Sequence, residues 1–181
     1  MILSFTREFP WGKSANFKQK IKSGAKIHAF RSGERWQTGD KIHFWEGNPR
    51  NTTMNPEPFI LDNYDLAELW AVVPSKEDGD AGHVEIPLVF AVETFELTIN
   101  QQPDNEEKEV TLKIGNLFID TPELLEMIAI NDGFDSLEEF IEWFSISFKK
   151  KGIQKMKGQV IHWTDQLYDP ESAEALSKIN F

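Results

Sequence analysis

Residues 20–45 read KIKSGAKIHAFRSGERWQTGDKIHFW. A helix ends at Gly24, because the C-terminus of a helix favours a residue that adopts the left-handed conformation. A strand over about 26–31 follows, and a turn at Gly39 leads into a second strand over about 41–46. Few folds have a helix, a strand, a turn and a strand at this spacing, so these residues are the best guide to the fold.

The flanking segments predict one more strand, the body of the helix and a long insertion. Residues 2–9 favour a strand, and Ser14 is placed to cap a helix over about 15–23. From 48 to 83 the chain is rich in proline, glycine, asparagine and acidic residues. This composition predicts an insertion, 48–83, between barrel strands, with one short helix around 65–72.

Two long strands are predicted downstream from alternating apolar residues. The alternation over 84–99 changes phase near 93–94, which indicates a β-bulge. A second alternating run over 110–119 changes phase at Gly115, and the polar residues 101–108 predict a hairpin loop between the two runs. Long bulged strands joined by a hairpin favour a strongly curved sheet, as in a small barrel.

Two helices and a closing strand complete the predicted fold. Thr121, followed by proline, begins the first helix, and Ser136 with Glu139 has the spacing of a capping box for the second. Residues 158–163 predict the last strand, and 170–181 a short helix or tail. We therefore predict an α+β fold, a small curved β-barrel flanked by helices. The apolar stripe of the second helix consists of Leu137, Phe140, Ile141, Phe144 and Phe148.

The composition is typical of one soluble domain. Of the 181 residues, 40% are hydrophobic and 12% are aromatic, so 1–181 is predicted to form a single domain with a substantial core. The absence of cysteine excludes disulfides, thiolate metal sites and cysteine nucleophiles. No secretory pattern follows Met1, and no apolar run approaches the roughly 18 residues of a membrane span. We therefore predict a cytoplasmic protein without membrane association.

The charge is strongly negative but unevenly distributed. A net charge of −11 disfavours nonspecific binding to a nucleic-acid backbone, because such binding requires a positive field. Basic residues nevertheless concentrate in 13–41 and in 149–157, while acids concentrate in 57–142. The two basic clusters either meet to form one positive face or remain separate solvated edges. The acidic insertion 48–83 is a candidate surface for a protein partner; the oligomeric state is not predicted.

Three histidines each follow an isoleucine in a predicted strand: His28, His43 and His162. Neutral imidazoles are good zinc ligands, but these three converge only if their strands are neighbours and share a face. No carboxylate is placed by spacing to complete such a set. Surface histidines, or histidines hydrogen-bonded within strands, are the alternative, and we predict neither a metal nor a cofactor.

Several motifs together resemble one known family. Residues 24–31, GAKIHAFR, resemble the G-x-K-x-x-x-x-R signature of ASCH domains, which belong to the PUA-like superfamily. Residues 36–40 are similar to that family's turn into the next strand. Residues 131–140, NDGFDSLEEF, resemble its D/E-G-F-x-S-x-x-E-F element, and 160–163, VIHW, stand where its closing strand is expected.

The resemblance covers roughly 1–47 and 84–168, and it is closest in wording to ASCH-like proteins of bacterial and phage genomes. It implies a small β-barrel flanked by helices, with a cleft between the first helix and the lysine-bearing strand. Relatives are proposed to bind RNA or modified nucleosides. One branch is an amidohydrolase that acts on acetylcytidine through a lysine, a threonine and a glutamate. These positions fall on Lys26, Ala29 and Asp132 here, so the hydroxyl is absent.

Six residues are predicted to serve the cleft. Lys26 can act as a nucleophile or general base if burial lowers its pKa, hold a phosphate or carbonyl oxygen, or pair with an acid such as Asp132. Arg31 can grip a phosphate or base edge, or form an ion pair that closes the barrel. Asp132 can serve as a general acid or base, or simply form a turn. An exposed Trp36 is expected, and the predicted ligand contacts are His28, Arg31, Arg35 and Trp36.

Two classes of function follow from these residues. The first is a PUA-like binding module that recognises RNA, a nucleotide or a modified nucleoside near Lys26 and Arg31. The second is a hydrolase that acts on a modified nucleoside or RNA with Lys26 and Asp132 as catalytic residues. The alanine at position 29 favours the binding module, because the hydrolase branch of the family has a hydroxyl there.

Overall fold

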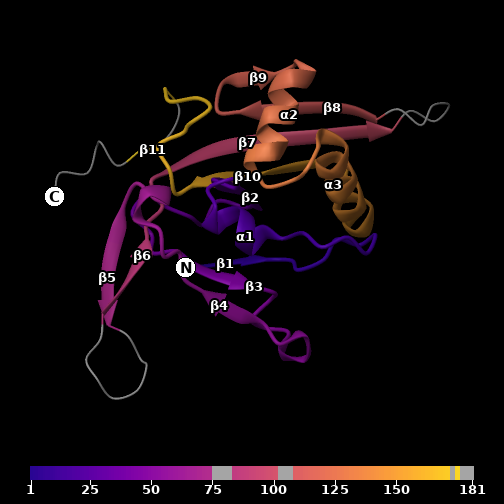
Figure 1. Ribbon diagram of the computed structural model, residues 1–181. Coiled ribbons are helices and arrows are strands. Elements are labelled where there is room, and N and C mark those ends of the chain that lie inside the picture. The colour runs from indigo at the N-terminus through magenta and orange to yellow at the C-terminus, as the bar shows by residue number, and fades with distance from the viewer. Residues whose placement is uncertain (75–82, 102–107, 172–173, 176–181) are drawn as a thin grey trace.

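The structure is a computed structural model that describes residues 1–74, 83–101, 108–171 and 174–175 (Figure 1). Its α+β composition confirms the predicted class. The helices are α1 (Phe17–Lys22), α2 (Pro122–Asn131) and α3 (Leu137–Lys151), with 3-10 turns at Thr52–Met54 and Tyr64–Leu66. The strands are β1 (Ile2–Phe5), β2 (His28–Ser32), β3 (His43–Glu46), β4 (Glu57–Phe59), β5 (Trp70–Pro74), β6 (His83–Pro87), β7 (Ala91–Gln101), β8 (Lys108–Ile114), β9 (Leu117–Ile119), β10 (Lys155–His162) and β11 (Glu174–Ala175).

The described strands form three sheets. In the first, β1 runs parallel to β3, and β4 is antiparallel to β3. The large sheet has the order β2-β10-β7-β8-β9, with β11 also paired to β7. The β5–β6 hairpin extends away from the helices (Figure 1). Within the described residues no single ladder of hydrogen bonds closes around all these strands, because β1 and β2 are not paired.

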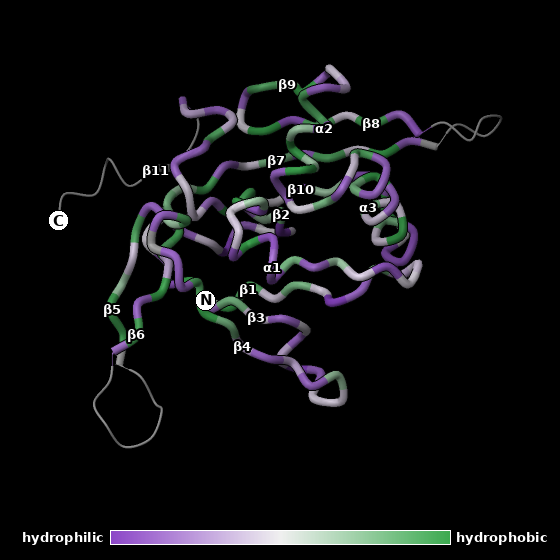
Figure 2. Tube along the Cα trace, in the orientation of Figure 1, coloured by the Kyte–Doolittle hydropathy of each residue, from purple (hydrophilic) through white to green (hydrophobic). Residues whose placement is uncertain are grey.

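The hydrophobic core lies between the two larger sheets and the helices. Phe140 and Phe144 of α3 are buried, as their stripe predicted, and their rings lie 5.8 and 6.2 Å from that of Phe30 on β2. On α1, the ring of Phe17 is 6.0 Å from that of Phe5 on β1. Such aromatic contacts add to the free energy of burial. Figure 2 shows hydrophobic residues alternating with hydrophilic ones along β7 and β8, whose inner faces complete the core.

The prediction of one bulged strand over 84–99 is wrong, because the chain changes sheets within it. β6 pairs with β5, whereas β7 pairs with β10 and β8. The β7–β10 register is continuous, so there is no bulge at 93–94. The apparent change of phase arises because Glu93 is fully buried on the same face of β7 as Phe95. A charged residue therefore occupies a core position.

The change of phase at Gly115 is a turn rather than a bulge. Gly115 and Asn116 form a two-residue connection between β8 and β9, so that Ile114 lies opposite Leu117. β9 is consequently an edge strand that folds back onto β8.

The helix ends follow the predicted signals at α2 and α3 but not at α1. Thr121 and Ser136 each accept a backbone N–H in the first turn, which confirms both predicted caps. α1 is shorter than predicted and begins at Phe17; Ser14 donates to the side chain of Asn16 instead of capping the helix. Within the described residues, no helix has the length and apolar composition needed to cross a membrane.

The segment 48–83 contributes to two sheets. β4 pairs with β3, and β5 occupies part of the range 65–72, where a helix was predicted. Phe59 and Leu61 are buried in the core. The described residues do not include 75–82 of this segment, 102–107 of the predicted hairpin loop, or 172–173 and 176–181 of the predicted tail.

Candidate functional site

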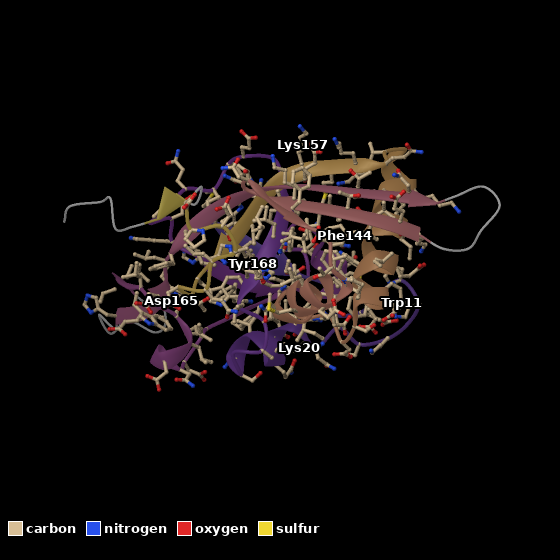
Figure 3. All side chains as sticks on the ribbon, turned by 90° about the horizontal axis from the view of Figure 1, so that it is seen from above. Trp11, Lys20, Phe144, Lys157, Asp165 and Tyr168 are labelled. Carbon is tan, nitrogen blue, oxygen red and sulfur yellow. The ribbon has the colours of Figure 1, made fainter. Side chains whose placement is uncertain are left out.

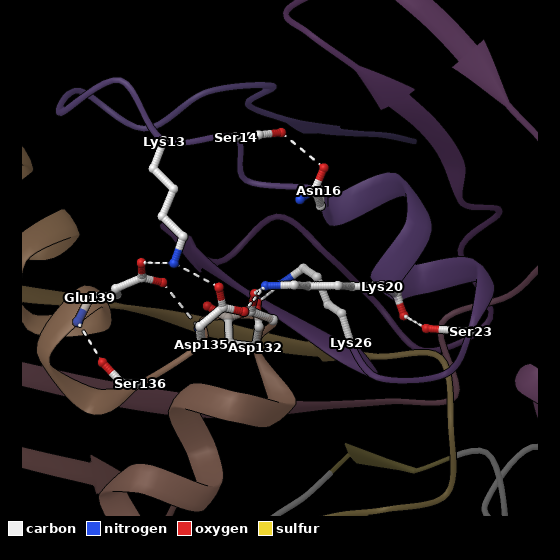
Figure 4. Close-up of polar contacts among 11 residues, drawn as sticks. Lys13, Ser14, Asn16, Lys20, Ser23, Lys26, Asp132, Asp135, Ser136 and Glu139 are labelled. Atoms are coloured by element: carbon white, nitrogen blue, oxygen red, sulfur yellow. Dashed lines mark hydrogen bonds and ion pairs between the residues drawn. The ribbon is translucent and has the colours of Figure 1, made fainter.

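The candidate site is centred on a buried ion pair between Lys26 and Asp132 (Figure 4). Lys26 lies two residues before β2, and Asp132 is the C-cap of α2. Nζ of Lys26 lies 2.5 Å from Oδ1 of Asp132 and also donates to the backbone carbonyl of Asp132. The two side chains are only 3% and 7% exposed. Of the alternatives for Lys26, pairing with Asp132 is the one observed.

Burial and pairing act in opposite directions on the pKa values of this pair. Burial lowers the pKa of Lys26 to about 8, although the charge of Asp132 opposes the change. Burial by itself would raise the pKa of Asp132, but the positive charge of Lys26 outweighs it and keeps that pKa below its usual value. Both groups are therefore charged at neutral pH.

Gly133 allows the turn after α2 to approach Lys26 closely. Its φ is +88°, and a Cβ at this position would lie 2.9 Å from Cδ of Lys26 and 3.1 Å from a ring carbon of Phe17. A side chain would therefore meet both steric conflict and backbone strain. The Asp-Gly-Phe order in the NDGFDSLEEF motif thus has a physical basis, since the aspartate pairs with the lysine and the glycine makes room for it.

Two more lysines bind the acids of the same turn, as Figure 4 shows. Nζ of Lys13 and Nζ of Lys20 lie 2.7 and 2.5 Å from the two carboxylate oxygens of Asp135. Lys13 also pairs with Glu139. These ion pairs are partly exposed, so each contributes little to stability. They neutralise part of the positive charge of the basic cluster 13–41.

A cavity of about 200 Å³ opens beside the ion pair. Lys26 and Asp132 line it together with Arg31 of β2, Ser4 of β1 and Lys151 at the end of α3. Aromatic residues of α1 and α3 supply its apolar walls. The two basic clusters of the sequence therefore meet here. The volume lies below the roughly 300–1,000 Å³ of typical ligand pockets, which suits a group the size of a base or a phosphate.

Arg31 bridges β2 to the unpaired edge of β1. Its guanidinium donates to the carbonyls of Ser4 and Phe30, each at 2.9 Å. Its Cζ lies 5.1 Å from the ring centroid of Phe5, a cation–π distance. Arg31 makes no ion pair in the part of the chain that the structure describes, so it spans the gap between strands through carbonyls rather than through a carboxylate.

A second cavity, of about 450 Å³, shares Ser4 with the first and is lined by Arg35 and Trp36. The prediction of an exposed Trp36 is wrong, since this residue is only 2% exposed. Gln159 on β10 accounts for the difference. Its side-chain amide accepts from the backbone N of Trp36 at 2.9 Å and donates to the backbone O of Trp36 at 3.0 Å, which holds the turn against the large sheet.

His28 belongs to a buried polar network and lines neither cavity. Its Nε2 lies 2.7 Å from the hydroxyl of Tyr168, which also accepts from Asn131 at 3.1 Å. Its Nδ1 is 3.6 Å from Oδ1 of Asp132, which exceeds a hydrogen-bond distance. The ring of His162 lies 5.5 Å away. The predicted role of His28 in ligand contact is therefore not compatible with its position.

Glu93 anchors the chain that follows β10. Its carboxylate accepts from the backbone N–H groups of Tyr168 and Asp169, and its Oε2 lies 2.7 Å from Nε2 of His162. Burial by itself would raise the pKa of Glu93, but His162 and the two N–H groups hold that pKa below its usual value. In the view of Figure 3, Tyr168 lies toward the middle of the molecule, whereas Lys157 lies at its edge.

The buried imidazole of His28 predicts a loss of stability in mild acid. Burial lowers the pKa of His28 from 6.5 to about 4. Its contribution to stability is complete above the unfolded pKa and is lost as the pH falls from 6.5 toward 4, because the unfolded chain takes up the proton first. We expect this group to lower the free energy of unfolding by about 2 kcal/mol between about pH 7 and pH 5.

Chemical denaturation of the wild type and of His28→Gln at both pH values measures this contribution. Glutamine retains polar atoms near Tyr168 but does not titrate, so the variant should lose less stability on acidification. Equal losses in the two proteins would assign the acid sensitivity to other groups.

The two cavities account for five of the six predicted site residues. Sequence reasoning missed Ser4 and offered Lys151 only as a member of the basic cluster 149–157. Lys151 belongs to a run of lysines at the end of a predicted helix, which the sequence shows. Nothing in the sequence indicates Ser4, because this residue contributes its backbone carbonyl. The first cavity is lined by Lys26, Arg31 and Asp132, and the second by Arg35 and Trp36.

The three histidines do not converge on a metal site. His28 and His162 are neighbours, but His43 is exposed and lies on β3 in another sheet. In the described ranges, no group of three or more histidine, aspartate or glutamate side chains is arranged to hold a metal ion.

Comparisons of the chain with models of protein families, with curated proteins and with solved structures found no match. The assignment of a function therefore rests on the residues and geometry of the two cavities. Residues of β1 line both cavities, and basic side chains from four separate segments of the chain line one or the other.

Proposed function

We propose that this chain is a binding module of the ASCH type, within the PUA-like superfamily, that recognises RNA, a nucleotide or a modified nucleoside. The ligand would lie in the β1 groove, by which we mean the cavity beside Lys26 and Asp132 together with the cavity beside Arg35 and Trp36. The observation that carries the proposal is the gathering of Arg31, Arg35 and Lys151 around this groove in a protein whose net charge is −11. A positive groove on an acidic body concentrates anionic ligands.

The order of the strands supports a PUA-like barrel that is open on one side. β1 pairs with β3, and a bridge between Lys41 and Leu88 connects the start of β3 to the end of β6. After β6 the chain enters β7, which pairs with β10, and β10 pairs with β2. The remaining gap, between β2 and β1, is spanned by the guanidinium of Arg31. The groove runs along this gap, and α1 and Lys26 flank it, as the resemblance to ASCH domains implies.

Two cations of the groove are available to a ligand. Arg35 and Lys151 are exposed, and within the described residues neither side chain makes an ion pair or hydrogen bond. Guanidinium and ammonium groups both bind phosphate, the former through two parallel hydrogen bonds. An anionic ligand can therefore bind here without displacing an existing partner of these groups.

The geometry of the ion pair favours binding over hydrolysis. Nζ of Lys26 is charged at neutral pH and contacts two oxygens of Asp132, whereas a nucleophilic lysine must be deprotonated and free to attack. Ala29 is fully buried and offers no hydroxyl where the hydrolase branch has a threonine. We therefore assign Lys26 and Asp132 to the floor of a binding groove.

Removal of one charge at Lys151 tests the proposal. We expect Lys151→Ala to weaken the binding of a labelled single-stranded RNA of about ten nucleotides by roughly 5- to 10-fold, because one charged contact to the ligand is lost. Lys149→Ala is the matched control. It removes the same charge from the same last turn of α3, but Lys149 lines a different cavity. Fluorescence anisotropy at a fixed salt concentration gives both affinities.

Three other results would change the assignment. Equal affinity of the two variants would exclude the β1 groove as the binding site. A wild-type protein that binds neither RNA nor nucleotides nor acetylcytidine would overturn the binding module. Cleaved or deacetylated products, detected by mass spectrometry and absent with Lys26→Ala, would assign the hydrolase instead.

A further inference from the structure

The second cavity of the β1 groove has the features of a phosphate site. Arg35 reaches it from the turn between β2 and β3, and Arg50 from the loop between β3 and β4. Both arginines are exposed, and within the described residues neither guanidinium makes an ion pair or hydrogen bond. Among the residues that the structure describes, no carboxylate lines this cavity. Two guanidinium groups from separate segments, unpaired within the described residues, therefore line one cavity of about 450 Å³.

Hydrogen bonds hold the backbone at or next to both arginines. The residue after Arg35 is Trp36, whose N–H and C=O are both hydrogen-bonded to the buried side chain of Gln159. The backbone N of Arg50 donates to Oδ1 of Asn48 at 3.0 Å, which fixes the start of its loop. Donors on a fixed backbone lose less conformational entropy when they bind a ligand. The cavity therefore presents two guanidinium groups whose side chains start from hydrogen-bonded backbone.

The two cavities follow one strand. Ile2 and Ser4 line the second cavity, and Ser4 and Thr6 line the first. Because successive strand residues rise by about 3.3 Å, the stretch from Ile2 to Thr6 is about 13 Å long if it is fully extended. This length exceeds a single nucleoside. A ligand that fills both cavities must therefore be longer than one nucleoside.

We propose that the ligand is a single strand of RNA that runs along β1, with one phosphate held between Arg35 and Arg50. Another part of the strand occupies the first cavity beside Arg31 and Lys151. This inference rests on the proposed function and narrows it to a ligand with several phosphates, in preference to a nucleoside or a mononucleotide. It assigns Arg50, in the loop before β4, a role in binding.

The salt dependence of affinity tests this inference. Each phosphate neutralised on a single strand contributes about 0.7 to the slope of log K against log salt concentration. We therefore expect the double variant Arg35→Ala/Arg50→Ala to reduce that slope by about 0.7 and to weaken binding of the labelled RNA about 10-fold or more. The control is Lys113→Ala/Lys149→Ala, which removes the same two charges from residues that line neither cavity of the groove. Uridine 5′-monophosphate serves as the one-phosphate probe.

The outcomes separate this inference from the proposed function. The double variant should keep the melting temperature of the wild type, because both side chains are exposed and unpaired. If its slope and affinity equal those of the wild type while Lys151→Ala still binds weakly, the phosphate site is wrong and the binding module stands. If the monophosphate binds the wild type as tightly as RNA does, the proposal that the ligand is a strand of RNA is likewise excluded. Absence of binding to every probe overturns both proposals.

Discussion

Replacement of Asp132 by alanine is expected to lower the free energy of unfolding by about 3–5 kcal/mol. The variant leaves the buried ammonium of Lys26 without its carboxylate, and a buried unpaired charge is more costly than the loss of an exposed pair. Lys26 would keep the carbonyl of the same turn and the rings of Phe17 and Phe5, whose centroids lie 4.9 and 5.4 Å from its Nζ. Urea denaturation at neutral pH measures the loss.

Asp135 supplies the matched control three residues further along the chain. Asp135 pairs with two lysines, but its side chain is 51% exposed. Asp135→Ala is therefore expected to change the free energy of unfolding by no more than about 1 kcal/mol. If the two variants lose comparable free energies of unfolding, burial of the pair between Lys26 and Asp132 is not the reason for its contribution to stability.

A double variant separates the effect of an unpaired charge from the effect of altered packing. Lys26→Met with Asp132→Leu fills similar space without charge, and such replacements of buried ion pairs are often neutral or stabilising. The double variant is expected to recover most of the stability that Asp132→Ala loses. If it remains as unstable as the single variant, the turn at Gly133 rather than the unpaired charge is the source of the loss.

Apart from the predicted cap at Ser14, signals that lie within one turn of helix were sufficient to predict the corresponding structure. The caps at Thr121 and Ser136 depend on residues three positions apart, and the stripe of α3 on residues three or four apart. Gly24 has the left-handed φ of +77° that its place after α1 requires. Each of these features is decided by neighbours in the sequence, so the pattern alone identifies it.

Features that depend on distant partners were misjudged. Glu93 occupies a core position because His162 and the segment after β10 satisfy its carboxylate, whereas an alternation rule places a charged residue outside. Trp36 has polar neighbours that indicated exposure, but Gln159, which is 123 residues away in sequence, draws its turn onto the sheet. No window of local sequence contains either pair of partners.

The candidate site likewise contains one feature that the sequence predicted and others that depend on distant parts of the chain. Pairing of Lys26 with Asp132 was among the alternatives that the residues themselves offered. The contributions of Lys151 and Arg50 to the groove were not predictable, because they depend on where the end of α3 and the loop before β4 meet the edge of β1. A groove assembled from four segments has no signature in any one of them.

Glu93→Ala is expected to destabilise the protein by about 3–5 kcal/mol, because the buried hydrogen-bond donors around its carboxylate are left without an acceptor. The backbone N–H groups of Tyr168 and Asp169 lose their acceptor, and His162 loses the carboxylate beside its ring. These bonds attach the chain after β10 to β7, together with the pairing of β11 and β7. Hydrogen exchange at Tyr168 and Asp169 should therefore accelerate more than exchange within β10, and denaturation gives the free energy.

Glu96, on the same strand, provides the matched control. The pH dependence of stability provides a second test. The carboxylate of Glu96 pairs with two lysines, at 2.5 and 2.9 Å, near the surface, so Glu96→Ala should have a much smaller effect. The folded pKa of Glu93 lies below its usual 4.5, so its stabilisation is complete above that pH and is lost as the pH falls through the folded value. The difference between wild type and Glu93→Ala should therefore narrow below about pH 4.5. A difference that is independent of pH would mean that Glu93 acts through packing rather than through its charge.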